Sequence, residues 1–111
     1  MAFGVLNKEK IMENFTILVI YKAKSGKDRA DFVKELTESG VLNAIRNEDG
    51  CFAYDYYFSN EDEKTLVLYE KWESPAHQKV HMTQPHMKTA MEIKSKYIES
   101  VELKKIDICD L

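Results

Sequence analysis

The hydrophobic residues of the chain are concentrated in three short segments that are typical of β-strands. Residues 15–22, FTILVIYK, are rich in β-branched and aromatic residues, and both of their alternating faces are largely apolar. Residues 51–58, CFAYDYYF, follow the turn sequence at 47–50, and residues 65–72, TLVLYEKW, follow a polar segment at 59–64. We therefore predict a first strand covered on both sides, and a hairpin formed by the second and third strands.

Helical spacing of apolar residues follows the first strand. Ser25 is a predicted N-cap, with Asp28 three residues later as in a capping box. Gly40 is expected to interrupt or end this helix, and residues 41–46 can form a further turn or two. The apolar positions that define the first helix are Phe32, Val33 and Leu36.

A second helical region follows the third strand. Ser74 is placed as an N-cap and Pro75 at the first helical position, and the helix that they open carries His77, Val80 and His81. The sequence Thr-Gln-Pro at 83–85 then restarts a helix. Its expected buried stripe consists of Met87, Ala90, Met91, Tyr97 and Ile98.

Residues 100–109 alternate once more and complete the predicted fold. The alternation slips at Lys104-Lys105, which predicts a bulge in a fourth strand. The order β-α-β-β-α-β is the split βαβ, or ferredoxin-like, arrangement of the α+β class, with a four-stranded antiparallel sheet and helices on one face. We expect residues 1–13 to be an N-terminal extension and residues 14–111 a single domain. The other sheet face would expose apolar side chains, so we expect a homodimer that packs sheet on sheet.

Composition narrows the function classes. The 111 residues are 44% hydrophobic and 32% charged, which is typical of a globular domain, and the net charge of −3 argues against nucleic acid as a partner. The longest aliphatic run, residues 17–20, is far shorter than the ~20 residues of a membrane helix. The two cysteines, Cys51 and Cys109, form no CxxC pair, and no signal peptide is recognised. We therefore expect reduced thiols and a cytoplasmic protein without a membrane partner.

Candidate chemistry gathers at the end of the third strand and in the helices that follow it. Glu70 and Trp72 share a strand face with Leu66 and Leu68, and that face should look toward the helices. His81 lies about two turns beyond Ser74 and can point back at Trp72. An indole, an imidazole and a carboxylate would then surround a pocket between sheet and helices.

Each of these residues also has a purely structural interpretation. Trp72 can be a core residue, and His81 can brace the interrupted helix. Glu70 can pair with Lys71 or Lys22, and His86 can simply begin a helix after the proline. The aromatic row Phe52, Tyr54, Tyr56 and Phe58 can be packing on one face of the sheet.

The same residues carry a resemblance to a known family. Glu70-x-Trp72 at the strand end, then His81, Thr83, Pro85, His86 and Met87, together with Gly50-Cys51 and Tyr54 at the start of the second strand, resemble the antibiotic biosynthesis monooxygenase superfamily. The resemblance covers residues 14–108. It implies a small dimeric α/β-barrel protein of the quinol-monooxygenase type.

The activity that this resemblance implies uses neither metal nor flavin. A base removes a phenolic proton, and the resulting anion gives an electron to O2, so the site needs an apolar pocket, a proton acceptor and an oxyanion-stabilising donor. His81 is the expected acceptor, and Trp72 can donate its N–H or stack on the substrate ring. Tyr54 and Tyr56, with Glu70 and His86, are the expected substrate-binding residues. We expect a small aromatic or quinol-type substrate, O2 as co-substrate and no cofactor.

Two other functions remain open on the same fold. One is an isomerase that moves protons on a small dicarbonyl compound, again with His81 as acid and base. The other is a non-enzymatic module that binds a small ligand, haem included. The haem-degrading relatives also need an asparagine on the first strand, and Asn14 lies at the very start of that strand.

A native metal site is not expected. His77 and His81 are four residues apart on a helix, but no HExxH motif is present and Pro85 separates His81 from His86. Neither a phosphate-binding loop nor a Ser-His-Asp grouping is recognised.

Overall fold

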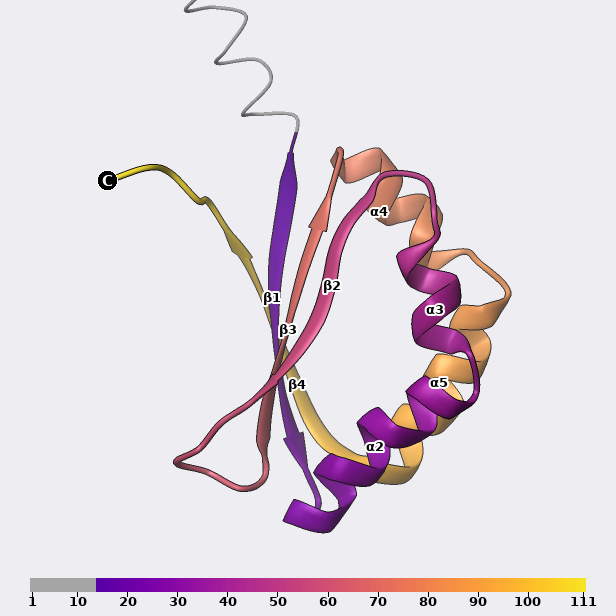
Figure 1. Ribbon diagram of the computed structural model, residues 1–111, viewed down its shortest axis with the longest axis vertical. Coiled ribbons are helices and arrows are strands. Elements are labelled where there is room, and N and C mark those ends of the chain that lie inside the picture. The colour runs from indigo at the N-terminus through magenta and orange to yellow at the C-terminus, as the bar shows by residue number, and fades with distance from the viewer. Residues whose placement is uncertain (1–13) are drawn as a thin grey trace, which may run out of the picture.

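The computed structural model describes residues 14–111, which form one antiparallel sheet covered on one face by helices (Figure 1). The predicted extension, residues 1–13, lies outside the described residues. In chain order the elements are β1 (Phe15–Ala23), α2 (Gly26–Glu38), α3 (Val41–Arg46), β2 (Cys51–Phe58), β3 (Thr65–Trp72), α4 (Pro75–Met82), α5 (His86–Tyr97) and β4 (Ile98–Ile106). The predicted bounds of β2 and β3 are confirmed residue for residue.

The sheet has the order β2-β3-β1-β4, and every neighbouring pair is antiparallel. The two strands contributed by each half of the chain are thus interleaved, which is the ferredoxin-like topology. The predicted fold class is confirmed. In Figure 1 all helices lie on one side of the sheet, and the other side carries no element of the described chain.

The irregularity of β4 is not where the sequence predicted it. The pairing of β4 with β1 is unbroken from Thr16↔Ile106 to Lys22↔Ser100, and the register shifts only at Ala23↔Ile98. The predicted bulge at Lys104-Lys105 is therefore wrong. The apparent slip arises because β4 is an edge strand whose C-terminal end runs past the helices (Figure 1), so that Lys105 can take a position on the helix side of the sheet.

A second bulge lies at the start of β2. Cys51 pairs with Trp72, and Ala53 pairs with Lys71, so Phe52 is the additional residue. Phe52 is 56% exposed, and it does not extend the row of Tyr54 and Tyr56 that faces the helices. The predicted four-residue aromatic row is therefore wrong at Phe52, since strict alternation assumes an unbroken pleat.

Local signals explain where the helices begin and end. The Ser25 hydroxyl accepts a hydrogen bond from the Asp28 backbone N–H at 3.0 Å, and Ser74 does the same for His77 at 3.3 Å, as predicted. Gly40 has φ +84° between α2 and α3, a left-handed conformation that glycine adopts without strain.

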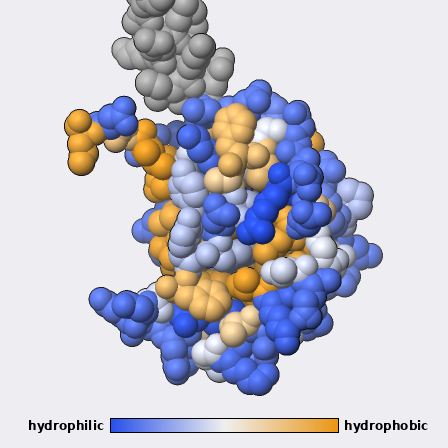
Figure 2. Space-filling view, in the orientation of Figure 1, coloured by the Kyte–Doolittle hydropathy of each residue, from blue (hydrophilic) through white to orange (hydrophobic). Residues whose placement is uncertain are grey.

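The core lies between the sheet and the helices. On α5 the buried residue is Ile93, which is 3% exposed, whereas Met91, which was predicted to be buried, is 62% exposed. Ile93 lies on the same face of the helix as Ala90 and Tyr97, which pack against the core. In Figure 2 the helical side is mostly hydrophilic, and hydrophobic residues reach the surface along the sheet side and in the seam between sheet and helices. Among residues 14–111, no helix combines the length and apolar content needed to cross a bilayer.

Candidate functional site

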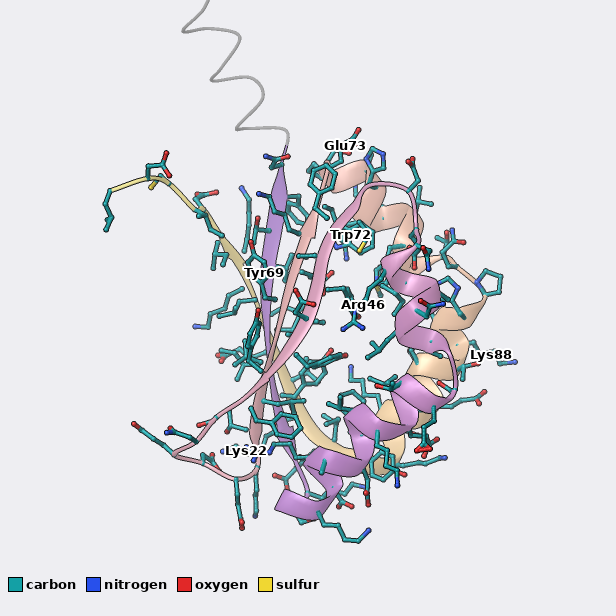
Figure 3. The ribbon with its side chains drawn as sticks, viewed as in Figure 1. Lys22, Arg46, Tyr69, Trp72, Glu73 and Lys88 are labelled. Carbon is teal, nitrogen blue, oxygen red and sulfur yellow. The ribbon has the colours of Figure 1, made fainter. Side chains whose placement is uncertain are left out.

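Trp72, Glu70 and His81 are brought together beneath the helices, as the sequence predicted. Trp72 is fully buried, and its indole Nε1 donates a hydrogen bond of 2.8 Å to Oε1 of Glu70. The Trp72 and His81 rings lie with centroids 4.6 Å apart and planes 34° apart. Figure 3 shows Trp72 on the helix side of the sheet, near α4. Among the described residues Glu70 forms no ion pair with either proposed lysine, and Lys22 instead binds Asp62 at 2.6 Å.

A carboxylate that the sequence analysis did not single out completes this group. Glu48, in the turn before β2, contacts Nδ1 of His81 at 3.0 and 3.1 Å through its two oxygens. Its Oε2 also lies 2.6 Å from Nε2 of His86. The side chains of Glu48 and His81 are 10% and 2% exposed, so these contacts are shielded from water. A carboxylate accepts hydrogen bonds, so Nδ1 of His81 carries a proton and Nε2 holds the lone pair when the ring is neutral.

One signal in the sequence could have identified Glu48. It begins the segment Glu-Asp-Gly-Cys, whose last two residues, Gly50 and Cys51, already carried the family resemblance. The turn geometry also brings it to the helices. Gly50 has φ +78°, and an added Cβ there would lie 2.4 Å from Cδ2 of His77, so the turn packs directly on α4.

The histidines of this region have separate roles in the structure. His77 lies against the Gly50 turn, with its side chain 25% exposed, Nδ1 2.7 Å from the Ser74 hydroxyl and Nε2 3.3 Å from Asp49. His86 begins α5 and reaches Glu48 rather than the pocket. Among residues 14–111, no group of three or more His, Cys, Asp or Glu side chains is arranged to hold a metal ion.

A cavity of about 180 Å³ lies between the sheet and the helices. Its walls come from every strand and every helix of the described chain, and they include His81, Glu70, Tyr54 and Tyr56 but neither Trp72 nor His86. The remaining lining residues are Val19, Tyr21, Phe32, Leu36, Ile45, Gln78, Met82, Met87, Ala90, Met91, Lys94, Val101 and Leu103. The cavity is therefore largely apolar, and its polar lining residues are the three tyrosines, His81, Glu70, Gln78 and Lys94.

The aromatic rings around the cavity form a connected series. Tyr54 lies 5.6 Å from His81 and 6.1 Å from Tyr56, and Tyr56 lies 5.9 Å from Tyr21, in each case between ring centroids. Arg46 reaches from α3 toward β2 (Figure 3) and donates from Nε to the Tyr54 carbonyl oxygen at 2.9 Å. This contact joins α3, and hence the turn that carries Glu48, to the strand that carries Tyr54.

Burial controls the protonation of the cavity's acidic groups. Burial raises the pKa of Glu70, and the hydrogen bond from Trp72 and the nearby His81 offset only part of that rise. Burial likewise raises the pKa values of Tyr21, Tyr54 and Tyr56 well above 10, so their hydroxyls stay protonated and can donate hydrogen bonds. Burial also raises the pKa of the Cys51 thiol to about 11, which disfavours its thiolate form.

Neither the volume of the cavity nor its lining favours haem. Drug-sized ligands occupy pockets of about 300–1,000 Å³, and this cavity measures about 180 Å³. Asn14 precedes β1 and lines a surface groove with Thr16, Lys105 and Cys109, not the cavity. The asparagine that haem-degrading relatives place on the first strand therefore has no counterpart at the cavity wall.

Comparisons with solved structures place the fold among known proteins. A candidate antibiotic biosynthesis monooxygenase from Caulobacter crescentus CB15 superposes with a TM-score of 0.76 at 16% identity, over 96% of this chain and 99% of that one. A second, from Nitrosomonas europaea, gives 0.72 at 24% identity, over 86% and 89%. A protein of unknown function from Bacteroides thetaiotaomicron, described as a possible oxidoreductase, gives 0.74 at 18% identity, over 87% and 99%.

At these identities the structural likeness shows the fold alone. No curated protein has a sequence that matches this chain. The sequence model of the family described as "Antibiotic biosynthesis monooxygenase" matches residues 14–93, which include Glu48, Glu70, Trp72, His81 and His86. The chain therefore belongs to the antibiotic biosynthesis monooxygenase family.

Proposed function

We propose that this protein is a cofactor-independent monooxygenase that oxidises a small aromatic, quinol-type substrate with O2. The observation that carries the proposal is the pair formed by Glu48 and His81, which is buried at the wall of an apolar cavity. Family membership supports the same reaction class. A largely apolar site favours this chemistry because it limits the access of water to a reactive anion.

In the proposed first step, Nε2 of His81 takes the phenolic proton of the bound substrate. Glu48 holds the opposite nitrogen, Nδ1, and its negative charge stabilises the imidazolium that forms. His86 contacts the same carboxylate at 2.6 Å and fixes its orientation. In this scheme His81 is the catalytic base, and Glu48 and His86 are positioning residues.

The substrate anion then reacts with O2. It transfers one electron to O2, the two radicals combine at a ring carbon, and His81 returns its proton to the peroxide. The hydroperoxide OH leaves as water together with the hydrogen of the ring carbon, and one oxygen atom of O2 stays on the ring as a new carbonyl. The two electrons that reduce the other oxygen atom to water therefore come from the substrate. The hydroxyls of Tyr54 and Tyr56 are protonated donors at the cavity wall, suited to a developing oxyanion. Trp72 supports the site from behind, packed on His81 and bonded to Glu70.

Oxygen uptake by metal-stripped protein with a panel of small hydroquinones tests this proposal. The matched pair of variants is His81→Ala, at the cavity wall, and His77→Gln, four residues away on α4, which contacts Asp49 and does not line the cavity. Uptake that survives chelation, falls with His81→Ala and persists with His77→Gln supports the proposal. Uptake that is unaffected by His81→Ala rejects His81 as the base.

An isomerase of a small dicarbonyl compound is the second candidate. The observation that favours it is that Glu70, with its raised pKa, faces the same cavity as His81, which gives the site two proton-carrying groups. Deuterium exchange from D2O into the substrate without oxygen uptake would support this reaction. Ligand binding with neither exchange nor uptake would favour a binding module instead.

We also propose that the protein forms a homodimer through the uncovered sheet face. The register of β1 and β3 places Leu18 and Ile20 beside Tyr69 and Val67 on the side away from the helices, and Figure 3 shows Tyr69 pointing to that side. A sheet face exposed to water normally carries polar residues at such positions. Light scattering on the wild type and on Leu18→Lys tests this: we expect a dimer that Leu18→Lys dissociates, and a monomeric wild type would reject it.

A further inference from the structure

The size and charge of the cavity together point to a narrower class of ligand. We propose that it holds a single aromatic ring that carries an anionic substituent such as a carboxylate, with Lys94 binding the anion. The reaction of this ligand with O2 rests on the proposed function, but the binding of the ligand does not.

The volume of the cavity limits the number of rings in the ligand. A dry cavity of about 150 Å³ engineered in another protein binds benzene, and the cavity here measures about 180 Å³. The difference leaves room for one or two small substituents on one ring. A fused three-ring system would exceed this volume, and part of it would have to project into solvent past the exposed side chains of Met91 and Leu103.

Lys94 determines the charge that we expect on the ligand. It is the one lysine or arginine among the residues that line the cavity, and it is half-buried on α5. Among residues 14–111 its ammonium has no ion pair or hydrogen bond, whereas Lys96, two residues later, binds Glu35 at 2.7 Å. A half-buried cation without a counter-ion, beside an apolar cavity, is satisfied by an anion on the ligand.

The positions of the charged groups also orient the ligand. Lys94 is eight residues beyond His86 on α5, which corresponds to about 12 Å along the helix axis. His86 contacts the same carboxylate as His81, so Lys94 approaches the cavity from the end away from that pair. The Glu48 carboxylate behind His81 disfavours an anion at that end, and a phenolic hydroxyl suits it. The ligand thus places its anion at Lys94 and its hydroxyl at His81.

Calorimetric titration at fixed pH and ionic strength tests this directly. The ligands are 4-hydroxybenzoate, its neutral methyl ester and anthracene-9-carboxylate, an anion with three fused rings. The variants are Lys94→Met and the control Lys88→Met, an exposed lysine on the outer side of α5 (Figure 3), with thermal melts to confirm folding.

We expect 4-hydroxybenzoate to bind roughly tenfold more tightly than the ester. Lys94→Met should abolish that preference, and Lys88→Met should keep it. Equal affinity for acid and ester, or a preference that survives Lys94→Met, would overturn the charge assignment. Binding of the three-ring anion as tight as that of the one-ring anion would overturn the size assignment.

The test separates this inference from the proposed function. Selective binding of the acid without oxygen uptake would support the ligand class and reject the monooxygenase. Oxygen uptake with neutral hydroquinones, without selective binding of the acid, would support the monooxygenase and reject the ligand class.

Discussion

Replacing Glu48 by glutamine tests the positioning of His81 most specifically. The substitution keeps the shape of the side chain and removes the charge that faces Nδ1 of His81 at 3.0 Å. Hydrogen bonds to charged groups contribute about 1.5–3 kcal/mol, and the exposed fraction of the Glu48 side chain, 10%, leaves little solvent screening. Because the imidazole becomes charged only as it takes the substrate proton, most of this loss should fall on the transition state.

The expected result for Glu48→Gln is therefore a kcat lower by roughly 10- to 150-fold, at 1.36 kcal/mol per decade, with little change in KM. Oxygen uptake at saturating substrate measures it. Glu73→Gln is the matched control, since Glu73 is 56% exposed and lies 3.8 Å from His77 instead of His81.

A second readout does not need a substrate. Long-range ¹⁵N NMR of the histidine rings should show a proton on Nδ1 of neutral His81 in the wild type, and a mixture of tautomers in Glu48→Gln, because the glutamine amide can also donate. A kcat within twofold of the wild type, together with an unchanged tautomer, would refute the reasoning.

Three further predictions concern stability. Arg29→Met should destabilise the fold by roughly 2–3 kcal/mol in urea unfolding. The reason is that Nη1 of Arg29 donates to the carbonyl oxygens of Ser59, Asp62 and Thr65 at 2.9–3.0 Å, and the guanidinium lies 4.4 Å from the Phe58 ring centre. A loss below 0.5 kcal/mol would contradict this. Gly50→Ala should cost more than Gly40→Ala in thermal melts, since both glycines have positive φ but only at Gly50 would the new Cβ meet His77; equal losses would contradict the close approach. Glu70 has its folded pKa raised above the ordinary 4.5, so it binds its proton more tightly in the folded state, and its contribution to stability is lost as pH rises above 4.5. Glu70→Gln, which can still accept a hydrogen bond from Trp72, should therefore gain stability relative to the wild type as the pH rises above 4.5. A stability difference that does not change with pH would contradict this expectation.

Local patterns predicted most of the fold because the main elements follow their intrinsic periodicity. The third strand, β3, alternates cleanly, and the caps at Ser25 and Ser74 use their local hydrogen bonds. The errors lie where burial depends on distant elements. Lys105 and Leu103 lie on an edge strand, and Leu103 is 64% exposed although it continues an apolar alternation. Phe52 was misplaced because a bulge adds one residue to a strand without leaving a mark in its composition.

The candidate site could likewise be predicted only in part from the sequence. Glu70 and Trp72 share a strand face by simple alternation, and the helix that follows carries His81 back to them, so their meeting was predictable. Glu48 lies 33 residues from His81 and 38 from His86, and only the packing of the turn on α4 and α5 joins them. Lys94 is one of several lysines in the sequence, and its place at the cavity wall follows from the crossing of α5 over the sheet.

The most direct test of the central claim is the fate of the oxygen atoms. Metal-stripped protein would be incubated with ¹⁸O2 and a one-ring hydroquinone, and the product analysed by mass spectrometry beside the His81→Ala variant. The proposed mechanism predicts one ¹⁸O atom in the product, at a rate that collapses in His81→Ala. A product without ¹⁸O, with the oxygen recovered as hydrogen peroxide, would contradict it.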